Sequence, residues 1–389
     1  MDSPKCRGCS LVEVCLPDES RRLREGSAAL DEDDDAPAED LVPLRRRRLV
    51  ASQVETRAVT VSLPGASVRK EGEALVVVPP PSMTDAKPVR VALDQVDELV
   101  AVGSVNVSTH AVMACLERSI PVSFHTAHGK LLGCVTAGVA SNVKLRAAQH
   151  AAASDAERSL ALAREFIRGK LRNQRVLLRR HGMFEGALAD EFDSLGRGID
   201  RVSDGDALRG VEGRAAVLYF GAYSKLLADR GGDGFAMDGR SRRPPRDPVN
   251  AMLSFGYAML AKDCAGVLLR VGFDPMRGFL HGMGWGRPAL ALDLMEEFRA
   301  LIVDSTVLRV VAEGRVKVED FHRELQGVTL KPGARRTFLQ ALDQRREEEI
   351  THPVFGYKVS YRRALELQAR VLARVLEGEA PRYVALTTR

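Results

Sequence analysis

The hydrophobic pattern of this chain changes once along its length, and that change constrains the fold more than any other feature. From about residue 49 to residue 135, short β-branched runs alternate with glycines and charged turn residues, a pattern typical of β-strands. After Ser141, apolar residues recur at helical spacing to the end of the chain. The sequence therefore predicts an α+β protein, with a small N-terminal β-rich domain followed by a larger all-α domain.

Four segments follow from this pattern and from local composition. The run Asp31–Asp40 is acidic, with Pro and Ala, and such a run cannot bury a core. Membrane contact is not expected, because we find no apolar run approaching the roughly 18 residues of a membrane span and no signal peptide, so the protein should be cytoplasmic. We expect a cysteine-rich stretch at residues 1–17, an acidic disordered linker at 18–44, the β-rich domain at 45–138 and the all-α domain at 139–389.

One stretch of the helical part, Gly272–Asp304, combines a glycine-rich loop with an acidic helix. The loop holds His281 and the only tryptophan of the chain, Trp285, and Pro288 marks the expected start of the helix. The helix has an apolar stripe, and its acids fall on the opposite side: Asp293, Glu296, Glu297 and Asp304. These acids either form a solvent-exposed face or, together with the imidazole, hold Mn²⁺ or Mg²⁺.

Basic residues are concentrated in two places. Residues 164–180 contain seven Lys and Arg and one Glu, and the arginines at positions i, i+4, i+7 and i+11 form a row on one helix face: Arg168, Arg172, Arg175 and Arg179. A loop and the start of the helix after it supply a second group: Arg240, Arg242, Arg243, Arg246 and Asn250. We expect both groups to contact nucleic-acid phosphates, although a solvated face remains the alternative for the arginine row.

Three helix starts can be read from capping residues. Ser154 is the expected N-cap of the helix that carries the arginine row, and Asp247 is the expected cap of an apolar helix that begins at Pro248. Glu212 is expected to begin the helix between them. An acid in a first turn can be either a partner of the helix dipole or part of a site.

Cysteines crowd the start of the chain, where Cys6, Cys9 and Cys15 have the spacing C-x2-C-x5-C. Thiolates this close in sequence can converge on a metal or an iron–sulfur cluster. The segment resembles the C-terminal end of the RecB-type, CRISPR-associated exonuclease, which implies a remnant of an exonuclease domain. A bound iron–sulfur cluster is expected only if the missing exonuclease part is present, and the alternative is a tail with free thiols.

Several motifs, in order and at consistent separations, resemble one family over roughly residues 45–389. They are E-G-R-A-A-x-x-Y-F at Glu212–Phe220, R-D-P-V-N-A-x-L-S-F-G-Y at Arg246–Tyr257, G-F-D-P-x-x-G-F-L-H at Gly272–His281, D-L-M-E-E-F-R at Asp293–Arg299 and H-P-V-F-G-Y at His352–Tyr357. Together they are similar to the CRISPR-associated endonuclease of spacer acquisition, the adaptation integrase. The resemblance implies an N-terminal β domain and a helical catalytic domain.

The resemblance also implies a site and a reaction. It makes Glu212, His281 and Glu296 ligands of Mn²⁺ or Mg²⁺, and Asp293 a second catalytic acid. The implied enzyme inserts short foreign DNA into a CRISPR array by 3′-OH attack on a phosphodiester. The implied partners are the prespacer duplex, leader–repeat DNA, a second copy of the chain and a dimer of a small ferredoxin-like CRISPR-associated protein. A non-catalytic DNA-binding scaffold and a stand-alone structure-specific nuclease are the alternatives.

Overall fold

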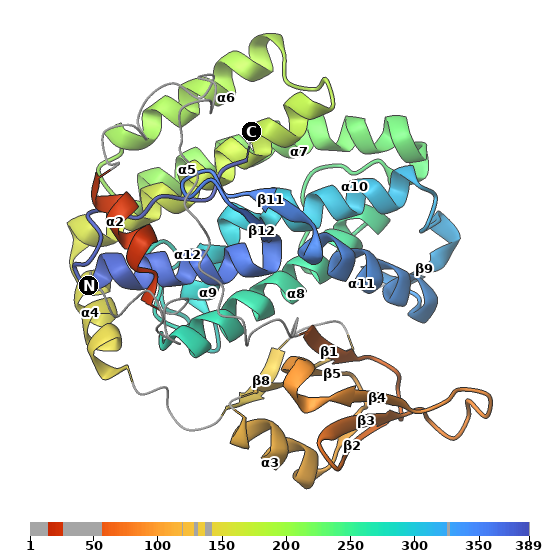
Figure 1. Ribbon diagram of the computed structural model, residues 1–389. Helices are drawn as coiled ribbons and strands as arrows, with labels where there is room; N and C mark the ends of the chain where they lie inside the picture. The colour runs from red at the N-terminus through yellow and green to blue at the C-terminus, as the bar shows by residue number, and fades with distance from the viewer. Residues whose placement is uncertain are drawn as a thin grey trace. The chain divides into compact units, whose positions relative to one another are not determined.

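The computed structural model describes residues 15–25, 57–118, 120–127, 131–136, 142–324 and 327–388. The chain divides into two compact units (Figure 1). One unit comprises Arg48–Ser141, and the other combines Met1–Arg47 with Asn142–Arg389. The first contains most of the strands and the second contains most of the helices, as the change of hydrophobic pattern predicts.

The described residues of the smaller unit form two four-stranded sheets and one α-helix. The first sheet has the order β1 (Arg57–Val61), β5 (Val96–Val102), β7 (Val122–His125) and β8 (Leu131–Val135). Its first three strands are parallel and β8 is antiparallel. The second sheet has the order β4 (Val89–Ala92), β3 (Ala74–Val78), β2 (Ser67–Glu71) and β6 (Asn106–Val107). Helix α3 (Thr109–Glu117) is capped by the side chain of Ser108. Val68, Leu75, Leu99, Cys115 and Val122 form part of the shared core.

The larger unit is a helical assembly with two small hairpins. Its helices are α4 (Val143–Ser154), α5 (Ala156–Arg180), α6 (Gly186–Gly198), α7 (Gly205–Gly231), α8 (Pro248–Val271), α9 (Ala289–Met295), α10 (Ser305–Ala312), α11 (Pro332–Glu347) and α12 (Tyr361–Leu376). The hairpins, which the sequence analysis did not predict, pair β9 (Phe321–Glu324) with β10 (Gly327–Leu330) and β11 (Glu349–Thr351) with β12 (Lys358–Ser360).

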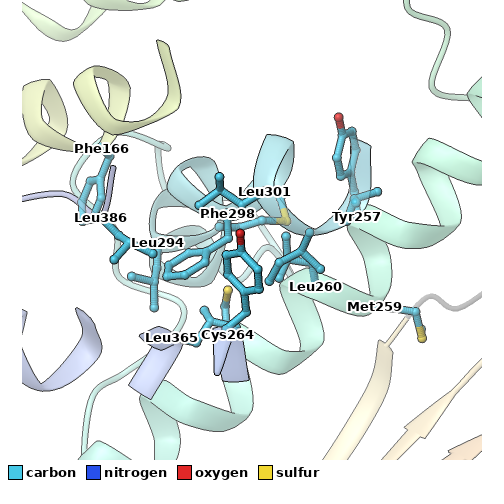
Figure 2. Close-up of a cluster of buried hydrophobic side chains, with 14 of the residues drawn as sticks. Phe166, Tyr257, Met259, Leu260, Cys264, Leu294, Phe298, Leu301, Leu365 and Leu386 are labelled. Carbon is cyan, nitrogen blue, oxygen red and sulfur yellow. The ribbon is translucent and has the colours of Figure 1, made fainter. Parts of the chain in front are cut away.

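Helix α8 forms the centre of this unit. It is capped by Asp247, has Pro248 in its first turn and ends at Gly272, whose φ of 109° requires a glycine. Figure 2 shows Leu260 and Cys264 of α8 in the same apolar cluster as Phe298 and Leu365.

By length and hydropathy, α8 alone among the described helices could cross a membrane, but 72% of its apolar window is buried inside the protein. The sequence analysis did not single it out, because Lys262 and Asp263 interrupt its apolar run. Burial of this kind is what a core helix of a folded domain shows.

Two predicted helix starts are wrong. Helix α5 is capped by Asp155, not Ser154, because Asp155 Oδ1 accepts hydrogen bonds from the N–H groups of Glu157 and Arg158, both at 3.0 Å. Helix α7 begins at Gly205 with Asp204 as its cap, so Glu212 lies two turns inside the helix and not at its start. Aspartate is a strong N-cap residue in both places.

The expected linker at residues 18–44 is also partly wrong, because helix α2 (Pro17–Glu25) packs on the larger unit. Leu23 is buried in its core, and Arg24 donates a hydrogen bond of 2.9 Å to the carbonyl of Glu379. Tyr357 donates a hydrogen bond of 2.9 Å to Glu19. Residues 18–25 are mostly charged and contain a single apolar side chain, Leu23. Pro17, Ser20 and Leu23 nevertheless fall on one helix face, and all three are buried.

Candidate active site

The four acids of the Gly272–Asp304 stretch are buried, so the interpretation as a solvent-exposed face is wrong. The exposed fractions of Asp293, Glu296, Glu297 and Asp304 are 0%, 2%, 0% and 0%. Helix α9 begins after Pro288 as predicted, but it changes to a 3-10 turn, η6 (Glu296–Phe298), and then to a π-helix, η7 (Arg299–Asp304). The helical repeat changes twice, and the four acids do not share one face. Asp293 and Glu296 both lie beside His281, whereas Glu297 and Asp304 meet other partners.

Asp293 shapes the loop that carries His281. Its Oδ2 accepts hydrogen bonds from the N–H groups of Phe279 (2.6 Å) and Leu280 (3.0 Å), and its Oδ1 accepts one from the N–H of His281 (2.9 Å). The same Oδ1 lies 2.6 Å from His281 Nδ1. A carboxylate that accepts a hydrogen bond from Nδ1–H leaves Nε2 without a proton, so the lone pair of Nε2 is available to a metal. Asp293 therefore orients the imidazole.

Gly278 permits this close packing. A Cβ atom at this position would lie 2.6 Å from Asp293 Oδ2 and 2.8 Å from the carbonyl carbon of Ala289. Any other residue would push the loop away from the carboxylate. The glycine is thus part of the local design that fixes the position of His281.

Glu296 and Glu212 meet at a buried lysine. Lys170 Nζ on α5 lies 2.9 Å from Glu296 Oε2 and also pairs with Glu212 Oε1 on α7. Arg299 pairs with Glu296 Oε1 at 2.9 Å, and His281 Nε2 lies 4.0 Å from the same oxygen. The sequence analysis missed Lys170 and Arg299 as members of this site. Lys170 was visible only as one cation of a basic helix, and Arg299 as the residue one turn after Glu296.

These cations determine the charge state of Glu296. Burial alone would raise the pKa of its carboxyl, but Arg299 and Lys170, with His281, outweigh burial and hold the pKa at about 2. Glu296 is therefore a carboxylate at any physiological pH. An ionised buried acid is what a metal site requires of its ligands.

The residues present fit a divalent cation. In the part of the chain that the structure describes, no three His, Cys, Asp or Glu side chains lie close enough together to form a ready metal cage. Instead the ammonium of Lys170 stands between the two carboxylates, in the place of a cation. Two carboxylates and an imidazole nitrogen are donors that suit Mn²⁺ and Mg²⁺. Glu212, Glu296 and His281 would hold the ion.

The other two acids have structural partners. Glu297 accepts hydrogen bonds from the hydroxyl of Tyr383, from Gln368 Nε2 (3.0 Å) and from the N–H of Leu386 (2.7 Å). Burial raises the pKa of Glu297 to about 8, although these hydrogen bonds oppose the rise. Asp304 accepts hydrogen bonds from the hydroxyls of Tyr219 (2.7 Å) and Tyr257 (2.6 Å). Glu297 thus anchors the C-terminal segment, and Asp304 ties three helices together.

The predicted arginine row is not a surface of one sign. Arg168 pairs with Glu165 at 3.2 Å and with Asp200 at 2.8 Å. Arg175 lies 3.6 Å from Asp193 and over the ring of Phe184. Acids from α6 and the turn after it therefore border this face. Arg172 and Arg179 complete the row, and contact of the row with phosphates remains a prediction.

In the second basic group, Asn250 is wrongly assigned to a ligand surface. It is fully buried, and its side chain bonds the carbonyl of Gly239 (3.0 Å), the N–H of Ser241 (3.0 Å) and Asp247 (2.6 Å). Arg240 donates to Asn250 Oδ1 (2.5 Å) and to Ser254 (3.1 Å). These two residues hold the loop together. The exposed guanidinium groups are those of Arg242, Arg243 and Arg246.

The cysteine motif lies largely outside the described residues. Cys6 and Cys9 are not described, and Cys15 is a half-buried free thiol just before α2. Within the described residues of the larger unit, Cys264 is buried in the core around α8. The iron–sulfur expectation therefore stays a prediction.

Comparisons with known proteins agree with the sequence motifs. The family model described as CRISPR associated protein Cas1 matches residues 59–344. A CRISPR-associated exonuclease Cas4/endonuclease Cas1 fusion of Geobacter sulfurreducens is 40% identical over 100% of this chain and 67% of its own length. A similar fusion of Rhodospirillum rubrum is 39% identical over 98% of this chain and 63% of its own length. This chain thus spans about two thirds of the length of these two fusion proteins.

Shorter relatives are matched over most of their length. A CRISPR-associated endonuclease Cas1 of Thermus thermophilus is 40% identical over 76% of this chain and 86% of its own length. Among solved structures, a casposase bound to integration product has a TM-score of 0.74 and 23% identity, and covers 85% of this chain and 93% of its own. A Cas1 protein from Thermotoga maritima has a TM-score of 0.73 and 20% identity, covering 86% and 100%. The predicted α+β fold is confirmed, and this chain belongs to the Cas1 family of CRISPR-associated proteins.

Proposed function

We propose that this chain is a divalent-metal-dependent DNA endonuclease and integrase of CRISPR spacer acquisition. It inserts short foreign DNA fragments into a CRISPR array in the cytoplasm by attack of a 3′-OH on a phosphodiester. One observation carries the proposal: Glu212, Glu296 and His281 come from three separate segments, yet both carboxylates pair with Lys170 Nζ, and His281 Nε2 lies 4.0 Å from Glu296 Oε1. The names of the relatives, endonucleases of the CRISPR system, support the same reaction class.

The chain's own groups prepare this site for phosphoryl chemistry. A bound Mn²⁺ or Mg²⁺ would supply Lewis-acid polarisation of the scissile phosphate and stabilise charge on the leaving oxygen. Asp293 fixes the imidazole with Nε2 turned toward Glu296, and Arg299 keeps Glu296 ionised. The reaction exchanges one phosphodiester for another, so no external energy source is needed. The exposed arginines Arg242, Arg243 and Arg246 would contact backbone phosphates, which position a duplex without reading its sequence.

The partners follow from the family and from the names of similar structures. One neighbour with a TM-score of 0.73 is a Cas6-RT-Cas1–Cas2 complex, and the casposase neighbour is bound to DNA integration product. The chain would therefore act on the prespacer duplex and the leader–repeat DNA as a homodimer. Two such dimers would be bridged by a dimer of a small ferredoxin-like CRISPR-associated protein.

The test is a disintegration assay on branched DNA, with Mn²⁺, Mg²⁺ and EDTA in parallel. We expect joined product with either ion, more with Mn²⁺ because of the imidazole ligand, and none with EDTA. Glu212→Gln, His281→Ala and Glu296→Gln should each abolish joining and leave DNA binding largely intact. Glu157 is exposed, and Glu157→Gln is the matched control, which should keep the joining activity.

Three results would overturn the proposal. DNA binding without joining or cleavage by the unmodified chain would indicate a non-catalytic scaffold. Joining that survives His281→Ala would exclude the imidazole from the reacting centre. Cleavage of branched DNA without any joined product would indicate a stand-alone structure-specific nuclease.

A further inference from the structure

Trp285 is displayed to solvent to an unusual degree. Its exposed fraction is 106%, as in an extended peptide, and its neighbour in the loop Met283 is 76% exposed. Tryptophan carries the largest apolar surface of any side chain, and folded proteins normally cover most of it. A large aromatic ring held in water beside a functional site indicates a surface that binds something.

The loop presents this ring from a fixed base. On one side Asp293 binds the N–H groups of residues 279 to 281. On the other side Leu290 donates its N–H to the carbonyl of Pro275 (3.0 Å). Residues 282–287 form the tip between these anchors, and all six are exposed. Within the tip, Arg287 donates its N–H to the carbonyl of Gly284 (3.1 Å). The tip is therefore short and held at both ends.

The tip stands next to the reacting centre. Trp285 follows His281 by four residues, so their Cα atoms are at most about 14 Å apart even in a fully extended chain. His281 Nε2 in turn lies 4.0 Å from Glu296. The indole is thus within reach of the first nucleotides on either side of a phosphate bound at Glu212, His281 and Glu296.

The charge around the ring favours a polyanion. Arg287 is exposed in the same loop. Arg209, 48% of whose side chain is exposed, pairs with Asp206 and donates a hydrogen bond of 3.2 Å to the carbonyl of Leu280 at the base of the loop. Two apolar side chains separated by glycines are too little surface for a stable protein interface, which needs several hundred Å² on each side. One exposed aromatic ring, in a loop that carries Arg287 and whose base contacts Arg209, matches the face of a nucleobase and its phosphate.

We propose that Trp285 stacks on an unpaired DNA base adjacent to the phosphodiester that reacts. This inference rests on the proposed function and adds a subsite to it. A base inside an intact duplex has both faces covered by its neighbours, so the ring can stack only where the DNA is branched, frayed or single-stranded. Trp285 would thereby favour branched DNA over continuous duplex.

The experiment uses the fact that Trp285 is the only tryptophan in the chain. Its fluorescence is measured during titration with three DNAs: a branched DNA with one unpaired base at the branch, the same DNA with an abasic nucleotide there, and a continuous duplex. We expect strong quenching by the first and at most half as much by the other two. Joining of the branched DNA is assayed in parallel.

Substitutions separate stacking from general binding. By anisotropy of labelled branched DNA, Trp285→Ala should weaken binding roughly 5- to 100-fold, the range that loss of one base stack gives. Trp285→Phe should restore much of the affinity, and the matched loop control Met283→Ala should change it little. The abasic DNA should bind the unmodified chain and Trp285→Ala equally.

The outcomes distinguish a failure of the stacking subsite from a failure of the proposed function. If the chain joins DNA but its fluorescence is equal with all three DNAs, the stacking subsite is wrong and the proposed function stands. A concentration-dependent blue shift of emission without DNA, with no later quenching by branched DNA, would show that a second copy covers the ring. Absence of joining alongside base-dependent quenching would count against the function and leave the subsite standing.

Discussion

At the scale of single residues, the unusual feature is the lysine between two acids. Lys170 and its carboxylate partner Glu296 are buried, and the neighbouring Arg299 and Glu212 are half-buried. An ammonium in this place neutralises acids that would otherwise repel each other, and a divalent ion at the same acids must displace it or share them. We therefore expect Lys170 to link the stability of the protein to metal binding at the proposed site.

This link can be measured without any DNA. In EDTA, Lys170→Met should lower the melting temperature, because removal of one partner from a buried ion pair costs roughly 3–5 kcal/mol. Added Mn²⁺ should then raise the melting temperature of the variant more than that of the unmodified chain, since only the variant has uncompensated carboxylates at the site. Thermal melts with and without Mn²⁺ test this.

Lys262→Met is the matched control. Lys262 is also buried, and its Nζ lies 3.1 Å from Asp263, which Arg346 also pairs at 2.7 Å. Lys262→Met should also have a lower melting temperature, but added Mn²⁺ should not raise that temperature more than it does in the unmodified chain. An equal Mn²⁺ response in all three proteins would contradict the role given to Lys170.

His352 makes a second prediction at this scale, on pH. It is buried and stacked on Phe355, and burial lowers the pKa of its imidazole to about 3, although a hydrogen bond with Gln368 opposes the fall. In the unfolded chain the pKa is near 6.5, so protons favour unfolding. The contribution of His352 to the free energy of unfolding is complete above pH 6.5, and it falls by up to about 1.4 kcal/mol per pH unit between pH 6.5 and pH 3.

Between pH 7.5 and pH 4.5 the unfolding free energy of the unmodified chain should fall. We expect that of His352→Gln to fall by about 2–3 kcal/mol less. Urea unfolding at the two pH values measures the difference. The exposed His322 on β9 gives the control, because His322→Gln should leave the pH dependence as it is. Parallel pH dependences of all three proteins would show that His352 titrates normally.

At the scale of elements, the switch from α9 through η6 to η7 determines which acid does what. Glu296 faces Lys170 and Arg299, while the next residue, Glu297, faces Tyr383, Gln368 and the C-terminal segment. Neighbouring glutamates in one motif therefore belong to a reactive site and to a structural anchor. Their side chains cannot exchange roles without a rotation of the whole turn.

Substitution by glutamine separates the two roles. Glu296→Gln should abolish joining of branched DNA, since it removes a charged ligand. Glu297→Gln should keep most of the joining activity, because Glu297 does not pair with Lys170. The substitution should chiefly lower the melting temperature, because an amide has one acceptor oxygen where the carboxyl group of Glu297 has two. The reverse result would mean that the two glutamates are assigned in the wrong order.

The helical elements also show what the sequence could and could not predict. The fold class, the start of α9 after Pro288 and the trio Glu212, His281 and Glu296 could be proposed from patterns and motifs. The burial of the acids could not, because helical spacing assumes one repeat and the segment uses three. Asn250 was misassigned because a polar residue near a helix start looks the same whether it meets a ligand or holds its own loop.

At the scale of the whole molecule, the cysteine-rich stretch connects this chain with its longer relatives. The fusion proteins it resembles extend beyond the length matched here, and Cys6, Cys9 and Cys15 supply three thiolates where four are usual. We expect the purified chain to contain no stoichiometric iron–sulfur cluster. Iron analysis and absorbance in the visible range check this, and about four irons per chain would point to a fourth ligand elsewhere.

The anchor at Glu297 also has a consequence for the synthesis of the protein. Asn173 donates hydrogen bonds to the carbonyls of Glu297 and of Leu386, 213 positions further along, and Glu297 accepts one from the N–H of Leu386. A ribosome adds roughly 5–20 residues per second, so these contacts close only many seconds after Asn173 has been made. The turn that carries Glu296 therefore reaches its final packing only after translation has passed Leu386, and a nascent chain that lacks Leu386 does not yet have this turn in place.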